Sequence, residues 1–275
     1  MKTLIITLEY PPQSGGISSF VANFAAHSLP NEIVIYAPQL KGDTSFDEFK
    51  PWKTYRKNPY FAFIWPRWLK LVWQVWRICR QENIAMINVH HALPVGYVAY
   101  ILKKVLHIPY TLFIHGTDIN LAMKGRFKRN TFKKVCANAE KIIVNIRFLQ
   151  EKVKLALGEQ HPPITILYPV PADIFLSAVD PDRLAALRAK LALTGKKVIL
   201  TVARLADGKG YPHLVHLLPE LLNKIPNLVW VILGTGPKQK EIMASIAKNS
   251  LQNVVRFLGE VTQAELPAFY QLADL

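Results

Sequence analysis

Two cations follow an apolar run in the second half of the chain. Arg204 and Lys209 lie in the segment VARLADGKG (202–210), between a predicted strand and a predicted amphipathic helix. A guanidinium and an ammonium at the carboxyl end of a parallel strand, beside the free N–H groups of a helix N-terminus, favour binding of a phosphate or diphosphate. A surface loop with two solvated cations is the alternative. The residue types therefore indicate an anion-binding loop, and the solvated surface loop stays open as an alternative.

Glycines at two further strand–helix junctions could bring the backbone close to a ligand. Gly15 and Gly16 follow the first predicted strand, and a helix opens near Ile17, so its N–H groups face that loop. An ordinary glycine turn is the alternative there. Gly234 and Gly236, in GTGP, indicate a backbone nest for a nucleotide sugar or phosphate. Neither loop is GxGxxG, so a nicotinamide cofactor is not expected.

Histidines end two of the predicted strands. His115 closes the run YTLFIH and precedes Gly116, a position where open α/β sheets bind ligands. A structural histidine bonded to a nearby carbonyl is the alternative. His90 and His91 are adjacent, so their side chains diverge from a strand, and the sequence shows no zinc-ligand spacing. We therefore expect His115 to contact a ligand and no metal site to form.

Residues 50–80 combine basic and aromatic side chains. They hold eight Lys and Arg, no Asp or Glu, and five of the six tryptophans. In the helix expected at 66–81, Arg67, Lys70, Gln74 and Arg77 share one face, and the apolar arc is wider than one sheet contact requires. A core helix with a solvated basic face is the favoured interpretation, and attachment to an anionic membrane surface is the sharper alternative. No nucleic-acid-binding module is recognised, so nucleic acid is not an expected partner.

The composition is that of a globular chain with two domains. Its 275 residues are 51% hydrophobic, and the net charge of +15 favours an anionic partner. Cys79 and Cys136 lie far apart in helical patterns, which indicates reduced thiols in a cytosol. The N-terminal apolar run is too short for a signal peptide, and no stretch reaches membrane-spanning length. The expected location is cytoplasmic.

Predicted strands and helices alternate along the chain, which favours an α/β class with mostly parallel sheets. A proline-rich piece at 168–175 precedes Asp180 and Pro181, which fit a helix start, and we place a domain boundary between residues 177 and 178. A last helix is expected at Gln263–Asp274. The expected strands are Leu4–Leu8, Glu32–Ala37, Ala85–Val89, Tyr110–His115, Lys141–Asn145, Thr165–Leu167, Val198–Ala203, Leu228–Leu233 and Val254–Leu258. The expected helices of the first domain lie near 17–28, 66–81, 95–106, 127–138 and 146–157.

With these residues in view, the chain resembles the retaining glycosyltransferases of family 4, which have the GT-B fold. PPQSGGISSF (11–20) resembles the family's PPxxGGI loop, and FIHGTDI (113–119) resembles its HGxD/E segment. ARLADGKG (203–210) resembles GRLxxxKG, and ILGTGP (232–237) resembles VGxGP. The final stretch, 255–275, resembles the strand and helix that lead into the donor site. The resemblance covers the whole chain.

The resemblance implies two Rossmann-like domains, an acceptor domain at 1–177 and an incomplete nucleotide-sugar domain at 178–275. Arg204 and Lys209 would neutralise the leaving diphosphate, and Gly16 would place an N–H near it. His115 would contact the transferred sugar. Phe257, Gly259 and Val261 would line the nucleobase pocket. No metal or other cofactor would be required, and the partners would be a nucleotide sugar, a lipid-linked or polysaccharide acceptor and, as a candidate, the inner membrane face.

The sequence also departs from the family pattern. Ala203 replaces a glycine, and YPVPAD (168–173) replaces PNGVD. The family's acidic segment, which holds the donor sugar and ribose, is expected shortly after Asp274, where the chain stops. We therefore expect slow turnover or none from the 275-residue form. The alternatives are a non-catalytic nucleotide-sugar-binding or membrane-associated partner protein, and a nucleotide-sugar 2-epimerase on the same fold.

Overall fold

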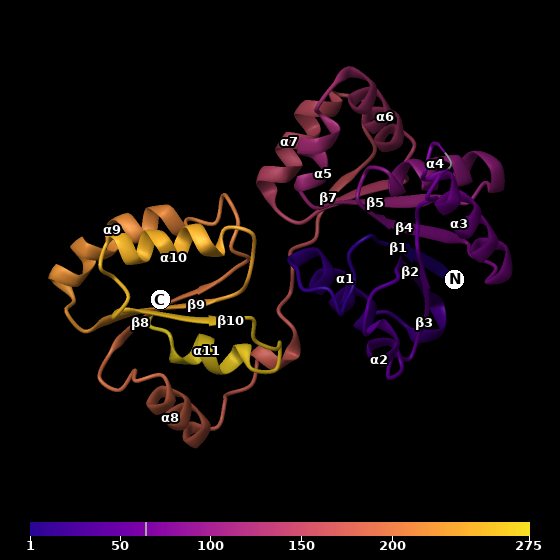
Figure 1. The fold of residues 1–275 in the computed structure, drawn as a ribbon. Coiled ribbons are helices and arrows are strands. Elements are labelled where there is room, and N and C mark those ends of the chain that lie inside the picture. Colours follow the sequence, from indigo (N-terminus) through magenta and orange to yellow (C-terminus); the bar gives the residue numbers. More distant parts are fainter. Residues whose placement is uncertain (64) are drawn as a thin grey trace. The chain divides into compact units, whose positions relative to one another are not determined.

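The chain forms two compact units, Met1–Val170 and Pro171–Leu275 (Figure 1). The computed structural model describes residues 1–63 and 65–275, and at residues 117 and 118 it describes only the backbone. The division falls earlier than the predicted boundary after residue 177. Residues before that point already belong to the second unit, because Phe175 packs edge-on against Tyr270 and the amide of Gln271 donates to the carbonyl of Ser177 at 3.2 Å.

The first unit is built on a parallel sheet with the order β3-β2-β1-β4-β5-β6-β7 in the described residues. Chain order reverses direction between β1 and β4, so this pair marks the topological switch point of the sheet. The strands are β1 (Thr3–Ile6), β2 (Ile33–Pro38), β3 (Lys53–Lys57), β4 (Met86–His90), β5 (Tyr110–Ile114), β6 (Lys141–Val144) and β7 (Ile164–Ile166).

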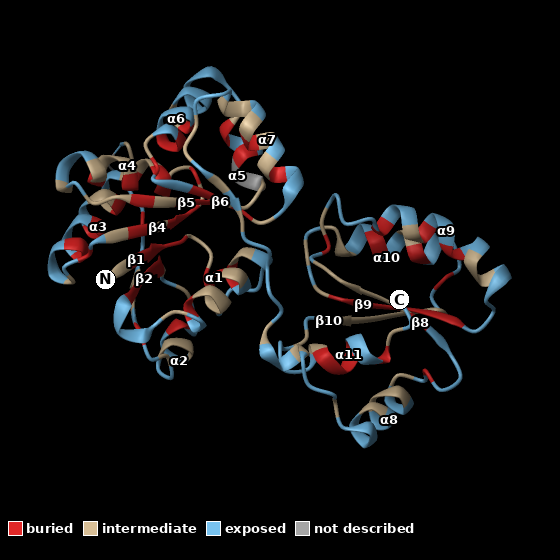
Figure 2. Ribbon diagram, turned by 180° about the vertical axis from the view of Figure 1, so that it is seen from behind, coloured by how far each residue is buried: buried red, intermediate tan, exposed pale blue. Residues whose placement is uncertain are grey.

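Helices cover both faces of this sheet, whose strands are largely buried (Figure 2). Alternate residues of β1 show the two faces: Ile5 packs in the core cluster that includes Val21 of α1, and Leu4 packs in the cluster that includes Leu71 of α3. The helices are α1 (Gly16–Ala26), α2 (Asp43–Asp47), α3 (Leu69–Gln81), α4 (Val95–Leu106), α5 (Thr117–Ala122), α6 (Arg126–Ala137) and α7 (Arg147–Leu157).

The second unit holds a parallel sheet of order β10-β9-β8 between two helical layers. In Figure 1, α9 and α10 lie on one face, where Tyr211 packs on Trp230, and α8 and α11 lie on the other, where Phe269 packs with Val229. The predicted N-cap of α8 is confirmed, since Asp180 accepts from the Asp182 N–H at 3.0 Å. The elements are α8 (Pro181–Lys190), β8 (Lys197–Val202), α9 (Tyr211–Lys224), β9 (Leu228–Leu233), α10 (Gln239–Lys248), β10 (Val255–Gly259) and α11 (Leu266–Leu272).

The last residues run along the edge of β8 that faces away from β9. The N–H of Leu275 donates to the carbonyl of Val198 at 3.2 Å, and the Leu275 carbonyl accepts from the Leu200 N–H at 2.7 Å. That pair of bonds follows the parallel pattern. The expected helix at Gln263–Asp274 is therefore too long, because the chain becomes extended after Leu272.

The predicted strands are all found, with no end shifted by more than two residues. One strand, β3 (Lys53–Lys57), was missed, because its sequence KTYRK lacks an apolar alternation and its edge position leaves it half-exposed. The short helices α2 and α5 were also missed. In the described part of the chain, no helix has the length and hydropathy needed to cross a membrane.

Candidate functional site

The loop between β8 and α9 carries Arg204 and Lys209 at the carboxyl end of a parallel strand. Both side chains are exposed. The one acid of the loop, Asp207, lies 3.5 Å from the Lys238 ammonium. Among the side chains that the structure describes, neither Arg204 nor Lys209 forms an ion pair. Two cations thus stand on one short loop with their charge uncompensated by neighbouring side chains, which is the arrangement that an anionic ligand requires.

Backbone and side-chain bonds fix the shape of this loop at both ends. Tyr211, the first residue of α9, is buried and donates its hydroxyl hydrogen to the carbonyl of Ala203 at 3.0 Å. Leu205 is fully buried, and its N–H donates to the carbonyl of Thr235 at 2.9 Å. The N–H of Lys238 donates in turn to the Leu205 carbonyl at 3.0 Å. The loop is therefore anchored on either side of Arg204.

Gly234 and Gly236 bring their own loop into direct contact with the Arg204 loop. A Cβ on Gly234 would lie 2.2 Å from the carbonyl oxygen of Ala203, and one on Gly236 would lie 2.3 Å from that of Leu205. Gly234 also has a φ of +132°. These glycines are thus required for close packing of two backbone segments. From the sequence we expect them to form a backbone nest for a ligand, and this role stays a prediction.

Phe257 lies in the middle of β10, Gly259 ends that strand, and Val261 follows it. Phe257 packs on the cluster under α9 and α10, whereas Val261 packs on the cluster under α8 and α11. The carbonyl of Gly259 accepts from the Gly234 N–H at 2.6 Å, which joins the β10 end to the glycine loop. The two side chains therefore point to opposite faces, and the predicted nucleobase pocket would draw chiefly on the backbone between them.

Three histidines and a glutamate meet at the carboxyl edge of the first sheet. His90 ends β4, His91 follows it, and His115 follows β5. Nδ1 of His90 lies 3.0 Å from Nε2 of His115, and Nε2 of His91 lies 3.4 Å from Oε1 of Glu9. This is the switch point, where open sheets bind ligands, and sequence analysis placed only His115 in it. In the described part of the chain, no set of three or more His, Cys, Asp or Glu side chains is arranged to hold a metal ion.

Aromatic rings enclose the His90–His115 pair. Phe113 stacks on His90 with ring centroids 4.2 Å apart, and Phe20 of α1 lies edge-on to His115 at 5.3 Å. Burial lowers the pKa of His115 to about 4, and the neighbouring His91 adds to that effect. Burial likewise lowers the pKa of His90 well below its ordinary value. Both rings are therefore neutral near pH 7 and act as hydrogen-bonding groups.

The first glycine loop lies beside this cluster. A Cβ on Gly15 would lie 3.6 Å from Oε2 of Glu9, and one on Gly16 would meet nothing within 4 Å. Ser18 donates its hydroxyl hydrogen to the carbonyl of Gln13 at 2.6 Å, which closes the loop onto the start of α1. The structure thus places Gly15, Gly16 and His115 at one edge of one sheet. Phosphate binding by Gly16 stays a prediction.

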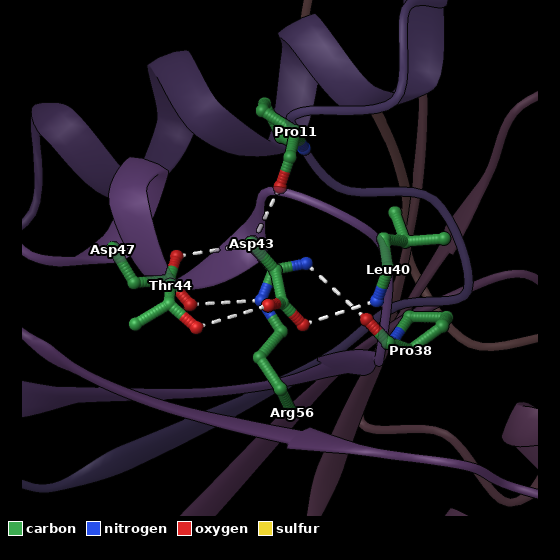
Figure 3. Close-up of polar contacts among 7 residues, drawn as sticks. All are labelled: Pro11, Pro38, Leu40, Asp43, Thr44, Asp47 and Arg56. Atoms are coloured by element: carbon green, nitrogen blue, oxygen red, sulfur yellow. Dashed lines mark hydrogen bonds and ion pairs between the residues drawn. The ribbon is translucent and has the colours of Figure 1, made fainter.

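Arg56 of β3 ties the segment before these glycines to the end of β2 (Figure 3). Its Nε and one amino nitrogen pair with the two carboxylate oxygens of Asp47 at 2.8 and 3.0 Å. The same guanidinium donates to the carbonyls of Pro11 and Pro38. From the sequence alone, Arg56 is only one of the eight basic residues of the segment 50–80. Its neighbours on adjacent strands, which a single sequence does not reveal, make it an internal support.

The predicted basic face of the 66–81 helix is also only partly solvated. Gln74 is buried and accepts the hydroxyl hydrogen of Tyr36 at 2.7 Å, so its expected place on the solvated face is wrong. Trp73 and Trp76 expose 56% and 38% of their surface, and the Arg77 guanidinium lies 5.8 Å from the Trp73 ring centroid. Arg80 stands in the same relation to Trp76, at 5.9 Å. We refer to Trp73, Trp76, Arg77 and Arg80 as the aromatic-basic face.

Comparison with known families identifies the family to which the chain belongs. Residues 14–170 match the family model of Glycosyltransferase Family 4, and residues 185–275 match that of Glycosyl transferases group 1. The chain belongs to glycosyltransferase family 4. Its two Rossmann-like sheets are those of the GT-B fold. This family 4 glycosyltransferase superposes with a TM-score of 0.81 on Anabaena Alr3699/HepE in complex with UDP-glucose, at 18% identity, covering 100% of this chain and 72% of that one.

Two curated relatives act on lipids according to their names. The chain is 24% identical to the GDP-mannose-dependent alpha-(1-6)-phosphatidylinositol monomannoside mannosyltransferase of Mycolicibacterium smegmatis, over 99% of this chain and 71% of the relative. It is 23% identical to the alpha-monoglucosyldiacylglycerol synthase of Acholeplasma laidlawii, over 100% of this chain and 73% of the relative. The family 4 glycosyltransferase thus spans about 71–73% of the length of these relatives.

Proposed function

We propose that this glycosyltransferase moves a hexosyl group from a nucleotide-diphosphate sugar to a lipid-linked or polysaccharide acceptor, with retention of anomeric configuration. The observation that carries the proposal is the unpaired state of Arg204 and Lys209 within the described residues, on an anchored loop at a strand's carboxyl end. The named activities of the M. smegmatis and A. laidlawii relatives support a lipid acceptor. The solved complex of HepE with UDP-glucose supports a nucleotide-sugar donor.

In this proposal the two cations act on the leaving group. Negative charge grows on the diphosphate as the glycosidic bond breaks, and preorganised donors that face this charge lower the barrier. Each charge-assisted hydrogen bond contributes about 1.5–3 kcal/mol. Because Arg204 and Lys209 supply the positive charge, we propose that no metal ion or other cofactor is needed for the transfer.

The histidine cluster supports binding of the sugar in the first unit. His115 is held in place by His90 and by the ring of Phe20, and burial keeps its pKa low. A neutral imidazole binds sugar hydroxyls through hydrogen bonds without attracting a second anion. We therefore propose that His115 contacts the transferred sugar and that Gly15 and Gly16 approach it from β1.

The acceptor side of the proposal rests on the aromatic-basic face. Exposed tryptophans beside arginines are typical of surfaces that lie at a membrane interface, and each cation near anionic lipid adds about 1 kcal/mol. Trp65 and Phe63, shortly before α3, are also largely exposed, at 86% and 101%. We propose that this face attaches the enzyme peripherally to the cytoplasmic side of the membrane, where a lipid-linked acceptor would lie.

One experiment tests the reaction itself. The protein is incubated for an extended period with UDP-glucose or GDP-mannose and vesicles holding diacylglycerol or phosphatidylinositol, with and without EDTA. We expect a glycolipid whose new linkage is α, as in the donor, formed equally with EDTA present. A β-linked product would overturn retention, and loss of product with EDTA would overturn metal independence. If no nucleotide sugar binds to the protein, the whole proposal fails.

A further inference from the structure

His90 is a fully enclosed ionisable side chain at the carboxyl edge of the first sheet. It has no exposed surface, and Phe113 stacks against its ring. Its Nδ1 lies 3.0 Å from Nε2 of His115, while its Nε2 is buried and has no hydrogen-bond partner among the described residues. A buried polar atom without a partner is costly, so the position of this ring requires an explanation.

The surroundings of the two ring nitrogens of His90 determine which nitrogen carries the proton. An N–H at the unpartnered Nε2 would leave a buried donor unsatisfied, which is rarer and costlier in folded proteins than an unsatisfied acceptor. The proton therefore lies on Nδ1, and His90 donates to Nε2 of His115. A neutral His115 that accepts at Nε2 must carry its own proton on Nδ1. One enclosed ring thus sets the tautomer of the next.

Nδ1 of His115 is the nitrogen left for a ligand. No hydrogen bond to it exists within the described residues, and His115 is only partly buried. The rings of Phe20 and His90 restrict its rotation, since they lie at centroid distances of 5.3 Å each. A fixed N–H at this place is available to donate to a hydroxyl or phosphate oxygen of a bound molecule.

We propose that His90 is a positioning residue that holds His115 in the Nδ1–H tautomer, so that His115 donates a hydrogen bond to an oxygen of the bound nucleotide sugar. The part that concerns the ligand rests on the proposed function, and the part that concerns the tautomer does not. Without His90, the His115 proton is free to move to Nε2. The nitrogen that faces the ligand would then carry a lone pair and could no longer donate to that oxygen.

The test uses nitrogen NMR of the full chain labelled with ¹⁵N-histidine at pH 7.5, in which protonated and unprotonated ring nitrogens have well-separated shifts. The variants are His90→Phe, which keeps the stacked ring but cannot donate, and His90→Asn, whose amide nitrogen takes the place of Nδ1. His216→Phe, at an exposed position of α9, is the control. In the wild type we expect His115 to be protonated at Nδ1, and in His90→Phe we expect a mixture or the Nε2–H form. His90→Asn and His216→Phe should keep the wild-type pattern.

Kinetics separate positioning from simple structural damage. We expect His90→Phe to lower kcat about tenfold while the KM for the donor changes less than about threefold, and His90→Asn to recover most of kcat. A wild-type His115 protonated at Nε2, or an unchanged tautomer in His90→Phe, would overturn the proposal. The wild-type spectrum decides this even if His90→Phe does not fold. If the His115 tautomer is as expected but UDP-glucose and GDP-mannose do not shift the His115 signals, the proposed hydrogen bond from His115 to the nucleotide sugar is wrong. Failure of the proposed function gives a different result, since the protein would then bind no nucleotide.

Discussion

The hydroxyl of Tyr211 donates to the carbonyl of Ala203 at 3.0 Å, and this bond joins the first residue of α9 to the residue after β8. The loop with Arg204 and Lys209 runs between these two points. Tyr211 is buried, and burial raises the pKa of its hydroxyl, so the hydroxyl is protonated near pH 7 and can donate this bond. The loop for which we propose anion binding is thus closed at its base by a buried side chain.

Removal of this hydroxyl should weaken both the fold and the loop. Tyr211→Phe leaves the Ala203 carbonyl without its partner, and we expect the free energy of unfolding to fall by about 1–3 kcal/mol. Binding of UDP or GDP should weaken several-fold, as measured by calorimetry. Tyr270→Phe, at an exposed tyrosine of α11, is the matched control and should change neither quantity. Wild-type stability and affinity in Tyr211→Phe would show that the bond is dispensable.

Gly236→Ala should displace the Arg204 loop. The new Cβ would lie 2.3 Å from the Leu205 carbonyl oxygen, so one of the two backbone segments must move. We expect a loss of about 1–3 kcal/mol in the free energy of unfolding and at least a tenfold loss of nucleoside-diphosphate affinity. Thr235→Ala, at the exposed residue next to it, keeps the backbone bonds and should resemble the wild type. If Gly236→Ala matches Thr235→Ala, the close packing has no role in binding.

Stability should fall in mild acid because of the buried histidines. The pKa of His115 is lowered by burial to about 4, so between that value and its ordinary value of 6.5 the unfolded chain binds more protons than the folded chain. The free energy of unfolding therefore decreases as pH falls through this interval, by about 2 kcal/mol between pH 7.5 and 5 for His115 alone. His90 adds to this in the same direction.

Urea unfolding at the two pH values measures this effect. His115→Asn removes the titrating group, so its stability should differ less between pH 7.5 and 5 than that of the wild type. Glu9 and His91 face the same cluster and stay in place in both proteins. A wild-type protein that is equally stable at both values, or more stable at pH 5, would contradict a lowered pKa.

The aromatic-basic face should bind anionic lipid. The affinity for vesicles of phosphatidylcholine and phosphatidylglycerol, measured by co-sedimentation, should fall about tenfold in Trp73→Ala/Trp76→Ala, because two interfacial rings are lost. Wild-type binding should be weak to phosphatidylcholine alone and should decrease with salt. Phe148→Ala, at an exposed aromatic residue of α7, is the control. Equal binding by the double variant and the control would rule out this face as the attachment site.

The strands and most helices could be predicted from the sequence, because buried parallel strands have continuous apolar sequences. LVWVIL (228–233), the predicted run, is β9 as observed, and every residue in it is buried. The strand KTYRK (53–57) carries no such signal, since an edge strand buries only part of its surface. The loops that bear Arg204 and His115 could be placed at strand ends by the same logic.

The side-chain contacts within the first unit could not be predicted in the same way. Arg56 pairs with Asp47 and reaches Pro11 only because β3 lies next to β2 at the sheet edge. His90 meets His115 because β4 and β5 are neighbours with His90 opposite Phe113. Strand order and register depend on the packing of the whole unit. A single sequence therefore indicates candidate site residues but does not show which side chains they contact.

The most direct test of the account is calorimetry of UDP and GDP binding to the full chain with and without the two loop cations. Arg204→Ala and Lys209→Ala should each weaken binding of the preferred diphosphate about tenfold or more, while Lys224→Ala, an exposed lysine at the far end of α9, should not. Binding of the parent nucleoside should be the same in all variants. If Arg204→Ala/Lys209→Ala binds UDP and GDP as tightly as the wild type, these cations do not hold the diphosphate and the central claim is wrong.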